Sequence, residues 1–351
     1  MQGALSREQS VRVQGVAILL MIWHHFFLDP SAYGDSFFVF PDASFRFAWF
    51  SRITVSLYSF VSGYGMFFVM KRATHRLQAS LTRALVMYLR HWTGFFLLIV
   101  LPDLLVFKNE PLDAVRLIGN LTAVNPDLNG AMWYVLQYLI HMLLAPVLWY
   151  LTTGNGKQRN RTRIICAVFC VLLVSGALFV PASRPFLKLL RDYTHPTLLL
   201  VFPAGFCCAR YRLYERFAAR IPYGRGGGFA LCLLLCAASC AVRMSLPENT
   251  SNTRFDCLIV PVFVYGLTGV TERLPRFVRN VLTWLGNRSV WMWIAHIPVL
   301  GATFFLCFFI RKALPFYLAE LLIMIPVAVL LSKLEACVTA RVSRRDPTAQ
   351  A

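Results

Sequence analysis

Two adjacent histidines, His24 and His25, stand near the end of a hydrophobic segment that runs from Val13 to Pro30. Ionisable side chains inside a membrane are energetically costly and usually serve a function. Histidine exchanges a proton near neutral pH, which makes this pair a candidate for general acid–base chemistry. Neighbouring residues on a helix point about 100° apart, so one ring can face a helix bundle while the other faces elsewhere. A pair of interfacial histidines that only hydrogen-bond to neighbouring helices is the alternative.

Other polar side chains also fall within hydrophobic segments. His296 lies in GNRSVWMWIAHIPVL, and His141 lies in an aromatic segment, where a hydrogen bond between helices is the favoured interpretation. The remaining members of this group are Ser56, Ser59, Ser62 and Asp256. Ser59 and Gly63 are four residues apart, a spacing of small residues that more often indicates close helix packing than catalysis.

The elements that must position these residues are membrane-spanning helices. Of the 351 residues, 58% are hydrophobic and only 15% are charged, whereas soluble domains carry about 25% charged residues. Apolar runs of about 20 residues predict an all-α, polytopic integral membrane protein. We expect about ten spans, near 11–28, 47–70, 84–107, 131–152, 162–181, 195–212, 226–246, 255–271, 288–309 and 315–338. Residues 1–340 then form one membrane-embedded domain, and 341–351 form a short basic tail.

The net charge of +19 is distributed unevenly between the two ends of the spans. Basic clusters follow each even-numbered span, whereas the first two odd-numbered connections are acidic or mixed. The positive-inside rule therefore predicts that both termini are cytoplasmic. In this setting the basic residues indicate orientation and contacts with anionic lipid or an anionic ligand, not nucleic-acid binding.

The ten cysteines do not indicate a metal centre. Several recur at helical spacing within predicted spans, such as Cys166 and Cys170, which is typical of small packing residues. No pair has the spacing of a zinc site, so we expect no metal.

Five segments together resemble acyltransferase family 3, polytopic membrane enzymes that move acyl groups, usually acetyl, onto hydroxyls of cell-surface glycans. In family order, these segments are GVAILLMIWHHFF at 15–27, FVSGYGMFF at 60–68, LNGAMWYVLQYLIHMLLAPVL at 128–148, FDCLIVPVF at 255–263 and LGNRSVWMWIAHIPVL at 285–300. The resemblance implies an O-acetyltransferase of the cell envelope that resides in the bacterial inner membrane. Acetyl-CoA would be a co-substrate, with no bound cofactor, and the acceptor would be a glycan or glycolipid.

The same resemblance implies roles for particular residues. His25 is the expected base, with His24 as the alternative and His296 as a substrate-binding or proton-relay residue. Helical depth does not place His296 level with His25. The binding candidates are Arg72 and Arg76 for the acyl-CoA phosphates, with Arg83 and Arg90 next, and Ser62, Tyr64 and Trp133 as oxyanion donors.

One position departs from the family pattern. The family usually has Arg or Lys eleven positions before its histidine, on the same helix face and about 16 Å away, and this chain has Gln14 there. Arg12 points elsewhere on the helix. Three explanations of Gln14 are open: another basic residue supplies the charge, this subgroup of the family tolerates glutamine, or the protein is catalytically impaired.

Two other classes remain open on the sequence. A proton-coupled transporter or flippase would use the histidines as a proton pathway, although no matching halves of the chain are evident. A glycan polymerase or ligase would usually have a large external loop, and the longest one expected here is only 108–130.

Overall fold

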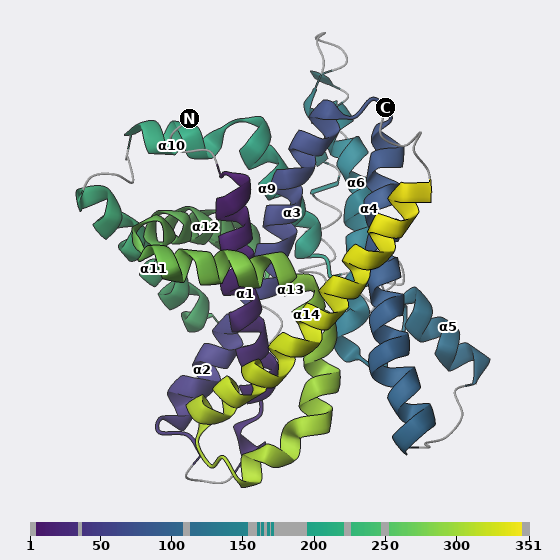
Figure 1. The fold of residues 1–351 in the computed structure, drawn as a ribbon. Coiled ribbons are helices and arrows are strands. Elements are labelled where there is room, and N and C mark those ends of the chain that lie inside the picture. Colours follow the sequence, from purple (N-terminus) through teal and green to yellow (C-terminus); the bar gives the residue numbers. More distant parts are fainter. Residues whose placement is uncertain are drawn as a thin grey trace, which may run out of the picture.

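The computed structural model of this chain describes residues 5–33, 37–107, 113–153, 195–220, 226–246 and 253–345, with short pieces between 160 and 171. Every regular element in these ranges is helical (Figure 1). The predicted fifth span at 162–181 and the end of the basic tail lie largely outside them.

Seven helical stretches are long and apolar enough to cross a membrane, and the protein is an integral membrane protein. They are Arg7–Phe27, Pro41–Arg72, Arg76–Val106, Gly130–Thr152, Gly227–Ser245, Arg276–Phe308 and Ala313–Ala340. Two shorter apolar helices, α9 (Leu198–Arg210) and α12 (Asp256–Arg273), correspond to the predicted sixth and eighth spans. The all-α, many-span architecture is confirmed for the described residues, and the count of ten remains a prediction.

The first helix, α1 (Arg7–Phe27), begins at a capping box. The Ser6 hydroxyl accepts a hydrogen bond from the Gln9 amide, and the Gln9 side chain accepts one from the Ser6 amide. These bonds satisfy amides that have no partner within the helix. The start of α1 and the end of α14 (Ala313–Arg345) lie on the same side of the molecule (Figure 1).

Reciprocal glycines bring α1 against α13 (Arg276–Thr303). A Cβ added to Gly15 would lie 2.1 Å from the Leu282 carbonyl oxygen, and one added to Gly286 would lie 1.9 Å from that of Val11. The helices therefore touch backbone to backbone, as small residues allow in membrane proteins.

A second glycine pair joins α3 (Ile53–Arg72) to α9. A Cβ on Gly63 would lie 2.1 Å from the Phe202 carbonyl oxygen, and one on Gly205 would lie 2.0 Å from that of Phe60. The packing role expected for the Ser59/Gly63 spacing is thus met by Gly63. The Ser59 hydroxyl lies 3.0 Å from that of Tyr134 on α6 (Trp133–Thr152).

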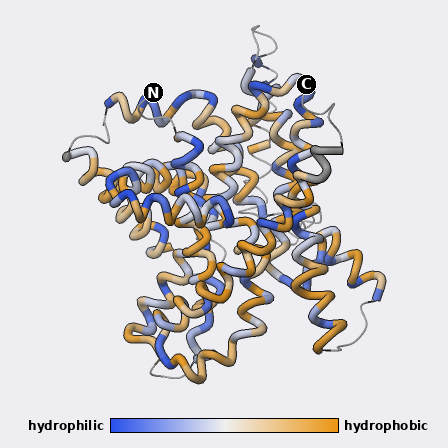
Figure 2. The backbone as a smooth tube through the Cα atoms, viewed as in Figure 1, coloured by the Kyte–Doolittle hydropathy of each residue, from blue (hydrophilic) through white to orange (hydrophobic). Residues whose placement is uncertain are grey.

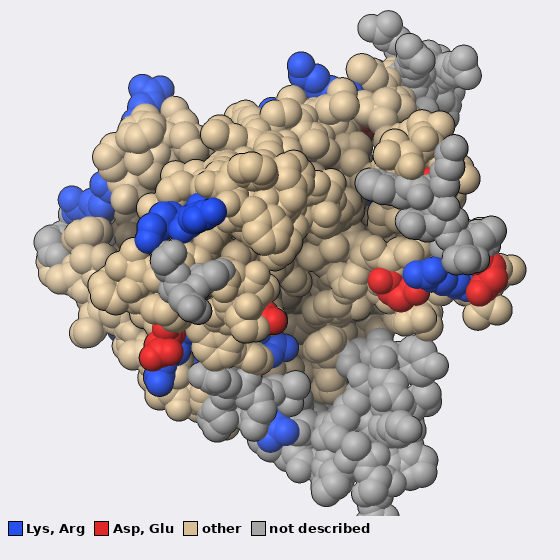
Figure 3. Space-filling view, turned by 90° about the horizontal axis from the view of Figure 1, so that it is seen from below, with Lys and Arg blue, Asp and Glu red and all other residues tan. Residues whose placement is uncertain are grey.

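The helices that surround the histidines are α1, α3, α4 (Arg76–Phe95), α6 and α13. Hydrophobic residues dominate these helices, and the hydrophilic ones gather towards α10 (Leu213–Arg220), the start of α1 and parts of the interior (Figure 2). On the face opposite the start of α1, charged side chains are sparse and the surface is hollowed near its middle (Figure 3).

Candidate active site

Three histidines from two helices meet at the centre of the site. The ring centroids of His24 and His25 are 5.0 Å apart, and those of His25 and His296 are 4.7 Å apart. His296 is fully buried, whereas His25 is partly exposed to the cavities beside it. The structure thus brings together the three histidines that the sequence singled out.

The expectation that His296 lies at a different depth from His25 is wrong. The helix that carries His296 begins at Arg276 and not near residue 288, so more helical residues precede the histidine than predicted. Because α1 and α13 run side by side at Gly15 and Gly286, their histidines reach the same level.

Hydrogen bonds to backbone carbonyls distinguish the three rings. His24 donates from Nδ1 to the Ala48 carbonyl (2.8 Å) at the end of α2 (Pro41–Ser51), and His296 donates from Nδ1 to the Trp293 carbonyl (2.5 Å). A carbonyl oxygen can only accept, so both Nδ1 atoms carry hydrogen. His25 has no hydrogen-bond partner among the described residues. Both of its ring nitrogens are therefore available to a substrate, whereas His24 and His296 each have one nitrogen bound to the backbone.

His25 stands between two cavities. The first, here called the inner cavity, has a volume of about 60 Å³. It is lined by Met21, His25, Val55, Tyr58, Met87, Ala131, Trp133, Tyr134, Ser289, Val290 and Trp293. The inner cavity is therefore small, mostly apolar, and supplied with hydroxyl and indole donors beside the histidine.

The second, here called the outer cavity, has a volume of about 140 Å³ and a more polar lining. It shares Met21, His25, Val55 and Trp133 with the inner cavity and adds His24, Ser51, Arg52, Thr54, Ser56, His195, Thr197, Leu198 and Thr253. Trp133 and His195 lie against each other with their ring centroids 4.0 Å apart. An aromatic wall and a cation thus face the same side of His25.

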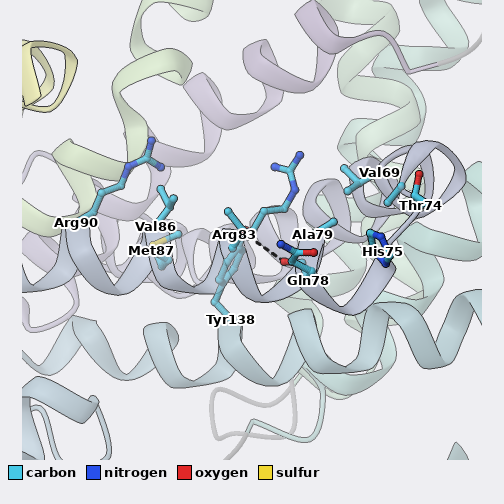
Figure 4. A pocket seen from close by; sticks show the side chains of 12 residues that line it. Val69, Thr74, His75, Gln78, Ala79, Arg83, Val86, Met87, Arg90 and Tyr138 are labelled. Carbon is cyan, nitrogen blue, oxygen red and sulfur yellow. Dashed lines mark hydrogen bonds between the residues drawn. The ribbon is translucent and has the colours of Figure 1, made fainter. Parts of the chain in front are cut away.

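A third and larger hollow, here called the basic groove, lies along α4 and has a volume of about 670 Å³ (Figure 4). Arg83 and Arg90 extend to the same side of α4, two helical turns and about 10.5 Å apart. Met87, between them, lines both the basic groove and the inner cavity. One methionine side chain therefore separates the groove from the small cavity that contains His25.

The predicted phosphate-binding arginines lie outside the basic groove. Arg72 is exposed at the end of α3. Arg76 donates from Nε to the Met70 carbonyl (3.0 Å) and lies over the Trp149 ring at 4.8 Å. The second choices, Arg83 and Arg90, line it instead, although Arg90 also pairs with Glu335 at 2.7 Å.

The three predicted oxyanion donors have different surroundings. Trp133 lines both cavities that adjoin His25. Ser62 interacts with the Tyr138 hydroxyl at the basic groove. Tyr64 accepts a hydrogen bond from the Leu5 amide (3.2 Å) and stacks on Tyr214, and it lines none of these three hollows.

A buried ion pair fixes the end of α2 beside the outer cavity. Arg243 on α11 (Gly226–Ser245) binds Asp256 at 2.9 Å and donates to the carbonyls of Trp49 and Phe50. Asp256 also accepts a 2.6 Å hydrogen bond from Ser56. This network places α2, and with it the Ala48 carbonyl that binds His24.

The residues missed from the sequence are Arg52, His195, Met87, Tyr58 and Ser289. Arg52 does carry a signal, because it is a cation within a predicted span. Arg12 cannot supply the charge that Gln14 lacks, because it is committed to Glu8 and Glu272. Arg52, by contrast, lines the outer cavity together with His25.

Within the described residues, no group of three or more His, Cys, Asp or Glu side chains is arranged to hold an ion. His141, by contrast, hydrogen-bonds Gln137 (3.0 Å) one turn earlier on the same helix, α6, and stacks on Phe202 of α9. Its contact between helices is therefore ring stacking, and the hydrogen bond expected between helices is instead made within one helix.

Comparison with known families gives one match. A family described as an acyltransferase domain matches residues 12–333, which span all the helices that line the inner cavity. Comparison with curated proteins and with solved structures found no match.

Proposed function

The chain belongs to acyltransferase family 3 and is a membrane acyltransferase, and we propose that it transfers an acetyl group from acetyl-CoA to a hydroxyl of an exported or cell-surface glycan. We further propose the bacterial inner membrane as its location, with both termini in the cytoplasm. The observation that carries the proposal is the position of His25 between the inner and outer cavities.

The basic groove supports acyl-CoA as the donor. Coenzyme A carries several phosphate charges, and arginine binds phosphate through two parallel hydrogen bonds. Arg83 is exposed towards the groove and pairs with no carboxylate among the described residues. A donor bound there would direct its thioester past Met87 towards His25.

The size of the inner cavity supports a short acyl group. Its volume of about 60 Å³ is far below the roughly 300–1,000 Å³ of pockets that enclose whole ligands. It suits the end of a donor molecule whose larger part stays in the basic groove. Acetyl is the acyl group that we propose.

The acceptor would reach His25 from the outer cavity. His25 takes the proton of the acceptor hydroxyl while the oxygen attacks the thioester carbon. The new C–O bond forms and the C–S bond breaks. The sulfur of coenzyme A leaves with the electron pair and recovers the proton, so no external oxidant or reductant is required.

The developing oxyanion needs fixed donors within the inner cavity. Trp133 lines that cavity, as do Ser289 and Tyr58, whose hydroxyl donates to the Gln14 carbonyl (3.3 Å) and would have to turn from it to serve as a donor. These groups replace Ser62 and Tyr64 as our candidates. Trp133 is retained from the sequence prediction.

The proposal is tested with membranes that contain the wild-type protein, His25→Ala or His24→Ala, radiolabelled acetyl-CoA and extracted envelope glycan. We expect the label to enter the glycan with the wild type and to fall about 10²–10⁴-fold with His25→Ala, the usual contribution of a general base. His24→Ala should retain more activity, because His24 bonds to a backbone carbonyl.

An equal loss of transfer activity in His24→Ala and His25→Ala would mean that the two histidines act as a structural pair and that His25 is not the single general base. Proton-coupled solute uptake with no acetylated product would establish a transporter instead. No product from the wild type with any of several acceptors would indicate an impaired enzyme, for which Gln14 is the sequence signal.

A further inference from the structure

Arg52 is a cation in a membrane span without a carboxylate partner among the described residues. It stands between α2 and α3, is half-buried, and lines the outer cavity with His24 and His25. The guanidinium carbon of Arg52 lies over the face of Trp49, 4.9 Å from the ring centroid. A weak contact of this kind compensates only part of the cost of desolvating a guanidinium.

The nearby carboxylate does not neutralise it. Asp256 is completely buried and is bound by Arg243 through Nε (2.9 Å) and Nη2 (3.3 Å), and by Ser56 (2.6 Å). Two arginines therefore share one acidic group, and the positive charge that remains is at Arg52. The outer cavity is a preformed place for one negative charge.

The rest of the cavity wall suits a sugar. Trp133 and His195 present adjoining rings. The Ser51 and Thr54 hydroxyls donate to the backbone carbonyls of Phe47 and Ser51 (2.7 Å each), so towards the cavity they can accept hydrogen bonds from sugar hydroxyls. A volume of about 140 Å³ is small for a whole oligosaccharide, so only the reacting unit of a longer chain would enter.

We propose that the outer cavity binds an acceptor that carries an anionic group, a carboxylate or a phosphate, next to the hydroxyl to be acylated, and that Arg52 binds this group. This inference rests on the proposed function for the identity of the reaction, and on the geometry of Arg52 for the charge of the ligand. The planar guanidinium suits both oxyanions, because each can accept two parallel hydrogen bonds.

Binding is measured first, so that the result does not depend on turnover. The full chain in nanodiscs is titrated calorimetrically with three probes: methyl glucuronide, glucose 1-phosphate and methyl glucoside. We expect at least one anionic probe to bind about tenfold or more tightly than the neutral one. Preference for the carboxylate or for the phosphate then identifies the source of the charge.

The variants are Arg52→Gln, Arg52→Lys and a matched control, Arg46→Gln, at an exposed arginine on the neighbouring helix α2. Arg52→Gln should lower affinity for the preferred anionic probe about tenfold or more and leave the neutral probe unchanged. Arg52→Lys should recover part of the loss, and Arg46→Gln should bind as the wild type does. Thermal unfolding checks that each variant is folded.

Equal affinity of the wild type for all three probes, or an unchanged preference in folded Arg52→Gln, would overturn the proposal. In the transfer assay, an oxyanion-stabilising Arg52 would instead lower kcat equally for anionic and neutral acceptors, and that result also overturns it. Failure of wild-type transfer would count against the proposed function, while the titrations would still decide the charge of the ligand.

Discussion

At the scale of single residues, the site is defined by which histidine nitrogens are already occupied. His24 and His296 each use Nδ1 to bind a backbone carbonyl, so each ring is fixed in position. The Nε2 atom of His296 is buried and has no partner within the part of the chain that the structure describes, a condition that typically costs about 1–3 kcal/mol. His25 lies against this ring, and a donated hydrogen bond from His25 would satisfy Nε2 and turn the other nitrogen of His25 towards substrate.

The arginines of the basic groove give the first prediction. Arg83→Ala should raise the KM for acetyl-CoA about tenfold or more with little change in kcat, because a hydrogen bond to a charged group contributes about 1.5–3 kcal/mol. Arg72→Ala should leave KM unchanged, since Arg72 lies outside the groove. Initial rates at varied acetyl-CoA concentration decide the matter. A larger increase in KM from Arg72→Ala than from Arg83→Ala would mean that the donor binds at the end of α3.

Residue types alone could identify His25 and His296, because an imidazole within a hydrophobic run is conspicuous. They could not separate Arg72 from Arg83, since both are arginines in the basic connection between the predicted spans at 47–70 and 84–107. Only packing shows that Arg83 faces a hollow. Arg52 was counted within a predicted span at 47–70, but its neighbours could not be deduced, because Arg243 and Asp256 come from distant segments.

At the scale of helices, the contact between α1 and α13 aligns the histidines. Gly286→Ala would place a Cβ 1.9 Å from the Val11 carbonyl oxygen, so the two helices must separate. We expect a loss of about 1–3 kcal/mol in stability, the usual cost of overpacking, together with reduced transfer. Gly301→Ala is the control on the same helix, because an added Cβ there meets no atom of the described residues within 4 Å beyond its chain neighbours and the adjacent helix backbone.

Thermal unfolding and acetyl transfer are measured on both alanine variants. If Gly286→Ala unfolds and reacts as Gly301→Ala does, close backbone contact is not what holds His25 against His296.

A second prediction at this scale concerns α5 (Ala114–Thr122), which lies in the predicted loop at 108–130. The Asn120 side-chain amide donates to Asp127 (2.6 Å), and Arg116 pairs with it at 2.6 Å. Hydrogen bonding by Asn120, followed by Arg116, lowers the pKa of the Asp127 carboxyl below its ordinary value. The charged form is therefore the one that holds the loop.

The stabilisation from Asp127 should be complete above its unfolded pKa, near 4, and should disappear as the pH falls through the lower folded value. Hydrogen exchange of the α5 amides, corrected for intrinsic rates, should accelerate over that acidic range. Asp127→Asn should exchange faster at neutral pH and lose the acidic transition. Asp42→Asn, at an exposed site on α2, should keep it. A transition that persists in Asp127→Asn would assign it to another group.

Helix boundaries mark where sequence reasoning was insufficient at this scale. Hydrophobic runs predicted the long spans, but α13 begins at Arg276 because a polar first turn can extend a helix beyond its apolar part. The helices α9, of 13 residues, and α12, of 18, contain Pro203 and Pro261 and pack against α3, so length and composition alone describe them poorly.

At the scale of the whole molecule, three hollows adjoin one another. The basic groove meets the inner cavity at Met87, and the inner cavity meets the outer cavity at His25 and Trp133. This arrangement of the groove and the two cavities results from the packing of α1, α3, α4, α6 and α13. It could not be predicted from any single segment of the sequence. Under the proposed function, the donor and the acceptor would reach His25 from different cavities without an open channel, which would leak ions.

Met87 is then the partition on the donor side, and its size should control access from the cytoplasm. Ser289 lines the inner cavity, so a cysteine introduced there reports on access to it. In oriented vesicles that carry Ser289→Cys, a charged thiol reagent added on the cytoplasmic side should react severalfold faster when Met87→Ala is also present. It should react more slowly with Met87→Trp. Val86→Ala is the matched control, because Val86 lines the groove but not the inner cavity.

Reaction of the native cysteines is subtracted by labelling the chain that lacks Ser289→Cys. Transfer of acetyl groups should fall with Met87→Trp, since the thioester must pass the same point. Equal labelling rates in Met87→Ala and Met87→Trp would mean that this side chain is not the barrier. Faster labelling from the opposite side, unaffected by residue 87, would mean that the inner cavity opens through His25 and that the donor enters from the outer cavity.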